Sequence, residues 1–357
     1  MAVAASNPPP IAVQFSLVIQ TSFLGDVVLT TPLMAELARR GPVHVVATPA
    51  GAPLLARNPD VAGVTIYDKR GTARGVGGLA NVAAALDAAR ARAAADGATD
   101  AVAYLAQGSV RSAALARLAG FRTRVGFSTS AGRWLYTHRV LYRDDRHHAE
   151  RLWSLADTSG AAPTREQLRP RLFPGGAERE AVDRVLSEAP AVAPLIALAP
   201  GSVWATKRWP YYADLARELS ARARLAVVGA RDDAPLAGEI AAAAPGCVID
   251  ATGRLSLLGS AELIRRCVVL VTNDSAPQHL ASAVGTPTIT VFGPTVPEFG
   301  FGPLAPHSLT AGVSGLDCRP CDRHGPARCP LGHWRCMRDL GAATIAGIVA
   351  RVEAERR

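Results

Sequence analysis

Short apolar segments alternate along the chain with longer segments in which apolar residues recur at helical spacing. Residues 15–20, FSLVIQ, are apolar and rich in β-branched side chains, which is typical of a buried strand, and residues 26–40 have helical periodicity. Such alternation favours parallel sheets covered by helices. The predicted strands are 15–20, 43–48, 64–68, 100–106 and 123–127 in a first series, and 195–200, 224–229, 247–250, 268–273 and 287–293 in a second. The predicted helices are 26–40, a short one near 52–57, 79–95 and 109–119, then 210–222, 233–244, 258–266 and 275–284.

The pattern loosens between the two series. Residues 160–193 predict only one strand and one helix, so we place a domain boundary there. Residues 344–357 have the pattern of an amphipathic helix, which either packs back across the boundary or lies on the surface. The predicted fold class is α/β, with two Rossmann-like, doubly wound parallel-sheet domains that face an interdomain cleft. The expected segments are a disordered lead at 1–14, a first domain at 15–175, a second domain at 176–343 and a C-terminal helix at 344–357.

Length and composition fit this arrangement and narrow the possible partners. A chain of 357 residues exceeds the roughly 250–300 residues at which single cores stop growing. Arg, Asp, Gly or Pro interrupts every apolar run before the roughly 18 residues that a membrane helix needs, and the N-terminus lacks a signal-peptide pattern, so we expect a cytoplasmic protein. The net charge of +9 indicates anionic partners. Because aromatic residues are only 5% and no basic helix carries stacking residues, nucleic acid is not an expected partner.

The loop after the first strand of each series could bind a dinucleotide if it carried the G-x-G-x-x-G fingerprint. The first loop reads TSFLGD (21–26) and the second reads PGSVWATK (200–207), so the fingerprint is absent and a nicotinamide-dependent dehydrogenase is disfavoured. Asp26 lies at the start of the helix that follows the first loop. It is either an ordinary carboxylate at a helix N-terminus or a general base that takes a proton from an attacking hydroxyl.

Two loops of the second series have the composition of an anion site. Ser202 and Thr206 carry hydroxyls that can bond phosphate oxygens, and Lys207 is one of only two lysines in a chain that otherwise uses arginine. In the third loop, NDSAPQH, a helix begins at Ser275, where free N–H groups attract anions, although Ser275 could be a simple cap. His279 either adds a donor there or is a half-buried core residue. The carboxyl ends of parallel strands converge, so we expect all three loops at one cleft.

Four cysteines near the C-terminus are spaced as C-x2-C-x7-C-x6-C. Clustered thiols in a cytosolic chain favour a metal over disulfides. Because the inner spacings are shorter than those of common paired-CxxC ribbons, structural zinc and reduced, packed thiols are both open. These cysteines are Cys318, Cys321, Cys329 and Cys336, with His324 and His333 nearby.

Four segments of the chain together resemble glycosyltransferase family 9, the ADP-heptose lipopolysaccharide heptosyltransferases, and most closely the heptosyltransferase II type. The resemblance implies the GT-B fold, inversion at the anomeric carbon, and no cofactor in catalysis, with structural zinc still possible. The segments are TSFLGDVVLTTPL (21–33), PGSVWATKRWP (200–210), NDSAPQHLASAVGTPTITVFGPT (273–295) and CPLGHWRCMRDL (329–340).

The resemblance also implies a role for individual residues. Asp26 would be the catalytic base, and Lys207 would hold the donor diphosphate as the second catalytic residue. Where the family has an acidic residue for the ribose, this chain has Arg231, so Asp232 or Asp233 would take that role. Leu255 would contact the adenine, and Ala276 replaces a glycine of the family. The implied substrate-binding residues are Ser22, Gly25, Ser202, Thr206, Asp232, Leu255, Asp274, Ser275, Ala276 and His279.

The partners implied by the resemblance are an ADP-heptose donor and the inner core of lipopolysaccharide as acceptor. The enzyme would touch the inner membrane peripherally, from the cytoplasmic side. The Arg-rich segment 121–148 would face the phosphorylated acceptor or would be a solvated basic surface. Two alternatives are another nucleotide-sugar transferase or epimerase of similar architecture, and a non-catalytic regulator that binds a nucleotide sugar.

Overall fold

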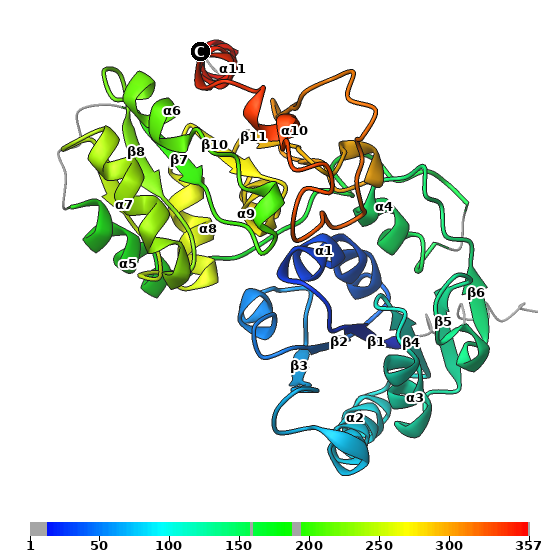
Figure 1. Ribbon diagram of the computed structural model, residues 1–357. Helices are drawn as coiled ribbons and strands as arrows, with labels where there is room; N and C mark the ends of the chain where they lie inside the picture. The colour runs from blue at the N-terminus through cyan, green and yellow to red at the C-terminus, as the bar shows by residue number, and fades with distance from the viewer. Residues whose placement is uncertain (1–12, 158–159, 188–193, 356–357) are drawn as a thin grey trace, which may run out of the picture.

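The computed structural model describes residues 13–157, 160–187 and 194–355. Positions 1–12 of the predicted disordered lead and part of the predicted domain boundary, 188–193, lie outside the described residues. The chain forms two halves, and each contains a six-stranded parallel sheet flanked by helices (Figure 1). The predicted α/β class with two doubly wound sheets is therefore confirmed.

The first half contains a sheet with strand order β3-β2-β1-β4-β5-β6, in which all neighbours are parallel. The order reverses between β1 and β4. The strands are β1 (Gln14–Gln20), β2 (Val43–Ala47), β3 (Gly63–Ile66), β4 (Asp100–Leu105), β5 (Thr123–Phe127) and β6 (His138–Val140). The helices are α1 (Leu24–Ala38), α2 (Gly75–Ala95), α3 (Val110–Leu118) and α4 (His148–Trp153), with 3-10 turns η1 (Ala52–Leu55) and η2 (Arg133–Leu135).

The second half repeats this topology, with strand order β12-β11-β10-β7-β8-β9 and a reversal between β7 and β10. The strands are β7 (Leu195–Ala199), β8 (Arg224–Val227), β9 (Val248–Asp250), β10 (Val269–Asn273), β11 (Thr288–Val291) and β12 (Leu309–Ala311). The helices are α5 (Gly176–Leu186), α6 (Tyr212–Leu219), α7 (Ala234–Ala243), α8 (Leu257–Arg265), α9 (Ala276–Val284), α10 (Arg335–Arg338) and α11 (Ala342–Ala354). The 3-10 turns are η3 (Ala205–Lys207), η4 (Arg231–Asp233) and η5 (Pro297–Phe299).

The structure corrects several details of the sequence prediction. The edge strands β6 and β12 and the short helix α4 were missed, because three or six residues are too few to show a period. The described part of 160–193 contains helix α5 but not the predicted strand. Of the two alternatives for the C-terminal helix, neither describes α11 fully: it lies in the second half and buries its apolar side chains against α6, β10 and β11.

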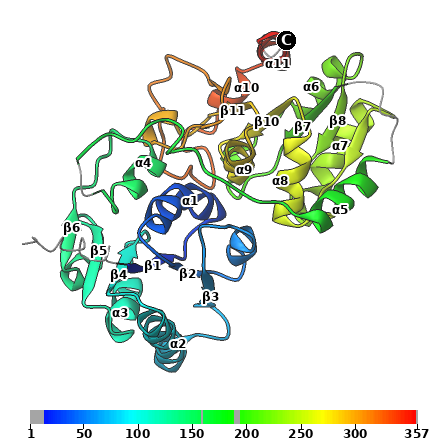
Figure 2. The same cartoon turned by 180° about the vertical axis from the view of Figure 1, so that it is seen from behind.

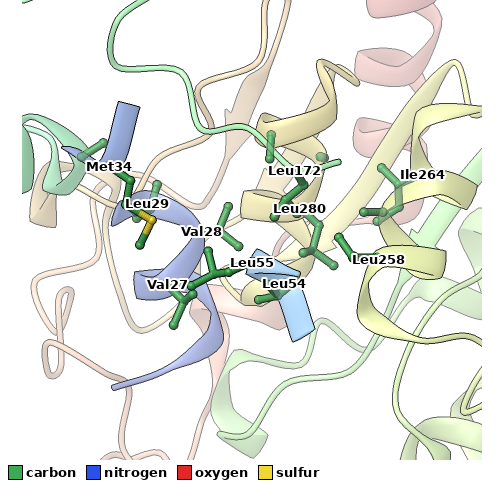
Figure 3. Close-up of a cluster of buried hydrophobic side chains, with 14 of the residues drawn as sticks. Val27, Val28, Leu29, Met34, Leu54, Leu55, Leu172, Leu258, Ile264 and Leu280 are labelled. Atoms are coloured by element: carbon green, nitrogen blue, oxygen red, sulfur yellow. The ribbon is translucent and has the colours of Figure 1, made fainter. Parts of the chain in front are cut away.

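An apolar cluster joins the two halves. Helix α1 packs against α9, and η1 packs against α8. Figure 3 shows Val27, Val28 and Leu55 of the first half beside Leu258 and Leu280 of the second, in one continuous cluster of buried side chains. In both views of the molecule α1 and α9 lie side by side (Figures 1 and 2). This packing fixes how the loops at the start of the two helices meet. Among the described helices, none is both long and apolar enough to cross a membrane.

Candidate functional site

The site lies at the strand-order reversals of the two sheets. In doubly wound sheets, the loops that leave neighbouring strands at such a reversal diverge to opposite faces and leave a binding site at the carboxyl ends. Here those loops are residues 21–26 after β1, 200–207 after β7 and 274–276 after β10. They are the three loops singled out in the sequence.

Asp26 occupies the first turn of α1, where the helix dipole favours a negative charge. The Ser22 hydroxyl donates a hydrogen bond to its Oδ2 atom, and the Ser22 backbone N–H is held by Gln20 Oε1 at 3.2 Å. The Asp26 side chain is 17% exposed. Asp26 is thus a partly accessible carboxylate with one hydroxyl partner on Oδ2.

A histidine that the sequence prediction did not single out lies beside Asp26. His148 begins α4, and its Nε2 is 3.5 Å from Asp26 Oδ1. Its ring stacks on Phe301 of the second half, with 4.8 Å between the ring centroids. Burial lowers the pKa of His148, the Asp26 charge raises it, and Arg151 lowers it again. In the sequence His148 was only the end of an Arg-rich segment, and no local pattern pointed to Asp26.

Lys207 and Asp274 form a buried ion pair in the second half. Lys207 Nζ is 2.6 Å from Asp274 Oδ2 and also donates to the Asp274 carbonyl oxygen at 3.1 Å. Thr295 donates to the same Oδ2 at 2.8 Å, and Gln278 donates to Oδ1 at 3.0 Å. Neither Thr295 nor Gln278 was predicted as a site residue. Both oxygens of Asp274 are occupied, so this carboxylate positions the lysine.

The cysteine-containing segment 318–336 covers the lysine loop. The Thr206 hydroxyl donates to the Pro326 carbonyl, and Trp334 Nε1 donates to the Thr206 carbonyl at 2.9 Å. Thr206 is buried, so its hydroxyl, predicted to bind phosphate, is committed to this segment. The segment also reaches the first half, because Arg323 pairs with Asp144 at 3.0 Å. Ser202, in contrast, is half-buried.

Helix α9 begins at this site, and no side chain caps the backbone N–H groups of its first turn. Ser275 is the N-cap residue, but its side chain makes no capping hydrogen bond, and Pro277 lies in the first turn. His279, one turn on, is buried, and its Nδ1 has no hydrogen-bond partner among the described residues. Burial lowers its pKa to about 3, so it is neutral and available as a hydrogen-bonding group. Ala276 is half-buried at this end.

The two halves meet closely at this point. A Cβ atom on Gly25, next to Asp26, would come within 2.6 Å of His279 Cδ2. Only glycine allows α1 to approach α9 this far. The structure therefore brings Gly25, between Ser22 and Asp26 in the first loop, against the predicted second-half residue His279.

The predicted ribose and adenine residues lie further along the second sheet. Asp232 is exposed in η4. Its neighbour Asp233 lies against Gly201 and Gly229, where an added Cβ would meet its carboxylate at 2.4 and 2.7 Å. Asp233 thus lies beside the loops after β7 and β8, and its carboxylate accepts a hydrogen bond from the Ala230 N–H. Leu255 is half-buried before α8 and packs on the apolar cluster.

The four cysteines do not assemble as a metal site in this structure. Among the described residues, no group of three or more His, Cys, Asp or Glu side chains could hold a metal ion. Burial raises the pKa of Cys336 to about 11 and raises that of Cys321, which keeps both as thiols. All four are free thiols in the structure, together with Cys247 and Cys267. The segment's contacts include those with the lysine loop and the Arg323–Asp144 pair with the first half.

Comparison with known proteins places this geometry in a family. The family described as "Glycosyltransferase family 9 (heptosyltransferase)" matches residues 95–331. Lipooligosaccharide heptosyltransferase 2 of Haemophilus influenzae is 37% identical over 115 residues, which cover 30% of this chain and 33% of that protein. Lipopolysaccharide heptosyltransferase 2 of Escherichia coli is 28% identical over 300 residues, which cover 79% of this chain and 84% of that protein. The match to the Haemophilus relative thus spans only a third of its length.

Solved structures agree on the fold. A glycosyltransferase family 9 protein from Veillonella parvula superposes with a TM-score of 0.81 at 21% identity, over 98% of this chain and 100% of that one. The ADP-heptose lipopolysaccharide heptosyltransferase II of E. coli gives a TM-score of 0.76 at 24% identity, over 96% of this chain and 99% of that one. Both similarities bear on the fold alone.

Proposed function

Because this chain belongs to glycosyltransferase family 9, the heptosyltransferase family, we propose that it transfers a heptose to the inner core of lipopolysaccharide. The donor is ADP-L-glycero-D-manno-heptose, and the acceptor is of the heptosyl-Kdo2-lipid A type, reached at the cytoplasmic face of the inner membrane. One observation carries the proposal. The partly accessible carboxylate of Asp26 follows Gly25, which lies against His279 of α9, and the second-half site at the start of α9 holds a buried lysine and an uncapped helix start.

The reaction proceeds as a single displacement. Asp26 takes the proton of an acceptor hydroxyl, and the oxygen forms a bond to the anomeric carbon of the donor. The bond from that carbon to the diphosphate breaks on the opposite side, so the configuration inverts and the electron pair leaves with ADP. The proton ends on Asp26 and is lost to solvent.

The second half stabilises the leaving diphosphate. Asp274 accepts from Lys207 through a carboxylate and a carbonyl oxygen, which leaves one of the three ammonium N–H groups for a phosphate oxygen. The first turn of α9 supplies backbone N–H groups and the positive end of a helix dipole. Fixed donors of this kind stabilise charge that develops on a leaving group. We therefore propose that catalysis needs no metal ion.

The acceptor site would lie in the first half, where the Arg-rich segment 121–148 is not uniform. Arg124 and Arg151 are buried and donate to backbone carbonyl groups, so they hold the fold. Arg133 and Arg139 are exposed and carry the charge that an anionic acceptor would meet, whereas the exposed Arg146 pairs with Asp145 and Glu150.

A transfer assay tests the proposal. The protein is incubated with ADP-heptose and a heptosyl-Kdo2-lipid A acceptor, with ADP-glucose and UDP-sugars as alternative donors, and products are read by mass spectrometry. We expect product with ADP-heptose only, and the same rate after EDTA treatment. Thermal protection by ADP-heptose without transfer would point to a binding regulator. Product from another nucleotide sugar, or activity lost in EDTA and restored by Mg²⁺, would contradict the proposed donor or the metal-free mechanism.

A further inference from the structure

We propose that His148 orients the Asp26 carboxylate, and that Phe301, from the other half of the molecule, holds His148 in that position. This inference rests on the proposed function, in which Asp26 is the base. It makes His148 a positioning residue for the reaction and makes the orientation of the base depend on how the second half is docked.

The contacts form a continuous line from one half to the other. Asp26 is approached by Ser22 at Oδ2 and by His148 Nε2 at Oδ1, at 3.5 Å. On the side away from Asp26, the His148 ring stacks on the Phe301 ring at an interplanar angle of 30°, with 4.8 Å between the ring centroids. Phe301 then meets His279 edge-on at 6.5 Å. A shift of Phe301 therefore reaches Asp26 through one ring.

The backbone of α4 is fixed to the turn that carries Phe301. The His148 N–H donates to the Gly300 carbonyl at 2.7 Å, and His147 Nε2 donates to the Gly302 carbonyl at 2.9 Å. Arg151 donates to the Phe299 carbonyl at 3.1 Å. Three donors of one short helix thus bind three successive or near-successive carbonyls of the second half, and His148 follows that turn.

The two adjacent histidines differ in a way that a packing role does not explain. His147 uses both ring nitrogens, since Nδ1 accepts from the Ala149 N–H at 3.1 Å and Nε2 bonds Gly302. His148 leaves Nδ1 buried without a hydrogen-bond partner among the described residues. Buried polar atoms are normally paired, so an unpaired one has a cost. The ring contributes only its stacked face and the nitrogen that faces Asp26.

A neutral imidazole suits this task. Burial lowers the pKa of His148 and Arg151 lowers it further, against the opposing effect of Asp26. A cation at this place would favour the charged form of Asp26 and weaken it as a base. An uncharged ring can restrict the carboxylate without that penalty. The other titratable groups near this line are His147, which is half-buried, and His279, which is buried and faces the charges of Asp274 and Lys207 in the second half.

Kinetics of four variants test the inference. His148→Ala should lower kcat by about 10-fold or more while the donor KM and the ADP affinity stay within about twofold, because misplacing a reacting group by an ångström can cost up to about 100-fold. His148→Gln, which can return an N–H near the Nε2 position, should recover most of kcat. Phe301→Leu should lower kcat several-fold, whereas Phe299→Leu, two residues away in the same turn, should not.

Equal kcat in wild type and His148→Ala would overturn the inference, as would equal losses in Phe301→Leu and Phe299→Leu. A loss in His148→Ala that appears only in thermal stability would do the same. Each of these results leaves heptosyl transfer by the wild type intact.

A second measurement needs no substrate, so it separates this inference from the proposed function. The His148 imidazole signal is followed by NMR against pH and assigned by its absence in His148→Gln. If the ring faces Asp26, its pKa should fall in Asp26→Asn, because the carboxylate raises it. An unchanged pKa would overturn the inference even in an active enzyme. A lower pKa in a protein that transfers no heptose would refute the proposed function alone.

Discussion

The two halves of the molecule have the same strand order, yet their carboxylates are treated in opposite ways. In the second half Asp274 receives hydrogen bonds or an ion pair on both oxygens, from Lys207, Thr295 and Gln278. In the first half Asp26 has one hydroxyl partner and a histidine at 3.5 Å. A carboxylate that already holds a lysine and two hydrogen-bond donors is poorly suited to accept a substrate proton. The contrast therefore supports the proposal that the base lies in the first half and the pair that holds the diphosphate lies in the second.

The contrast also shows where the chemistry of such a fold resides. Both sheets reverse strand order at the same relative position and both place a loop and a helix start there. The loop sequences differ. The first half has LGD at 24–26, and the second half has the loop 200–207 with its lysine, which segment 318–336 covers. Topology supplies the position, and a few side chains supply the function.

The largest effects are expected when Asp26 and Asp274 are each replaced by asparagine, because the two variants should fail in different ways. Asp26→Asn should lower kcat by about 10²-fold or more and leave ADP binding unchanged, since it removes the base and no phosphate ligand. Asp274→Asn should instead weaken ADP binding, because Lys207 loses its ionic partner. Steady-state kinetics and calorimetric titration of ADP measure both. Near-normal turnover in Asp26→Asn would remove this residue from the mechanism.

Removing the lysine tests the second half alone. Lys207→Ala should weaken ADP by about 10- to 150-fold, the range expected for a lost charge-assisted hydrogen bond of roughly 1.5–3 kcal/mol. Lys207→Arg should recover only part of this, because a guanidinium is broader than an ammonium. The matched control is Arg208→Ala, whose guanidinium donates to the Ser202 carbonyl at 2.9 Å and lies outside the ion pair. Equal ADP affinity in wild type and Lys207→Ala would mean that Lys207 does not bind the diphosphate and that only the first turn of α9 does.

Lys207→Ala also strands a buried carboxylate, so a folding defect must be separated from a binding defect. Breaking one partner of a buried pair is strongly destabilising, whereas removing both charges is much less so. The double variant Lys207→Ala/Asp274→Asn should therefore be more stable to urea than Lys207→Ala, yet still bind ADP weakly. Recovery of ADP affinity along with stability would mean that Lys207 acts only through the fold.

Most of the fold and the three loops of the site could be predicted from the sequence. Buried strands such as 15–20 and 268–273 are continuous apolar runs, and parallel topology follows from their alternation with helices. Asp26, Lys207 and Asp274 could be predicted as site residues because each lies in the loop, or the first turn of the helix, that follows a predicted strand. Local signals of this kind survive in a single sequence.

Contacts between distant segments could not be predicted in the same way. His148 meets Asp26 only because α4 packs on α1, and Phe301 reaches His148 from the other half. Thr295, in the loop after β11, and Gln278, in α9, both donate hydrogen bonds to Asp274. No regular spacing in the sequence links these residues. The hydrogen bond of Thr206 could not be predicted for the same reason, because its partner, Pro326, lies 120 residues away.

The close approach of the halves at Gly25 gives a smaller effect. Gly25→Ala places a Cβ 2.6 Å from His279 Cδ2, so one helix must move, at an expected cost of about 1–3 kcal/mol in the free energy of unfolding and a lower kcat. Gly238→Ala is the control, because Gly238 lies inside α7 with open space around its Cα and should gain about 0.5–1 kcal/mol. Urea unfolding measures both. Equal behaviour of the two variants would mean that α1 and α9 are not in contact in solution.

The last prediction concerns pH, because two of the side chains in the contact between the halves are the histidines His147 and His279. Burial lowers the pKa of His147 to about 4 and that of His279 to about 3, below the value of about 6.5 in an unfolded chain. Between pH 6.5 and 4 the unfolded state therefore binds protons that the folded state does not. Stability should fall as the pH drops from about 6.5 towards 4, by at most about 1.4 kcal/mol per pH unit for each such histidine.

Urea unfolding at pH 7.0, 6.0 and 5.0 measures this slope. His147→Gln keeps a donor for the Gly302 carbonyl but removes one titrating group, so its stability should depend less on pH than that of the wild type. His138→Gln, at an exposed position of β6, is the matched control for the loss of an imidazole away from the contact between the halves. If His147→Gln and the wild type lose stability in parallel, His147 is not held neutral where α4 meets the second half.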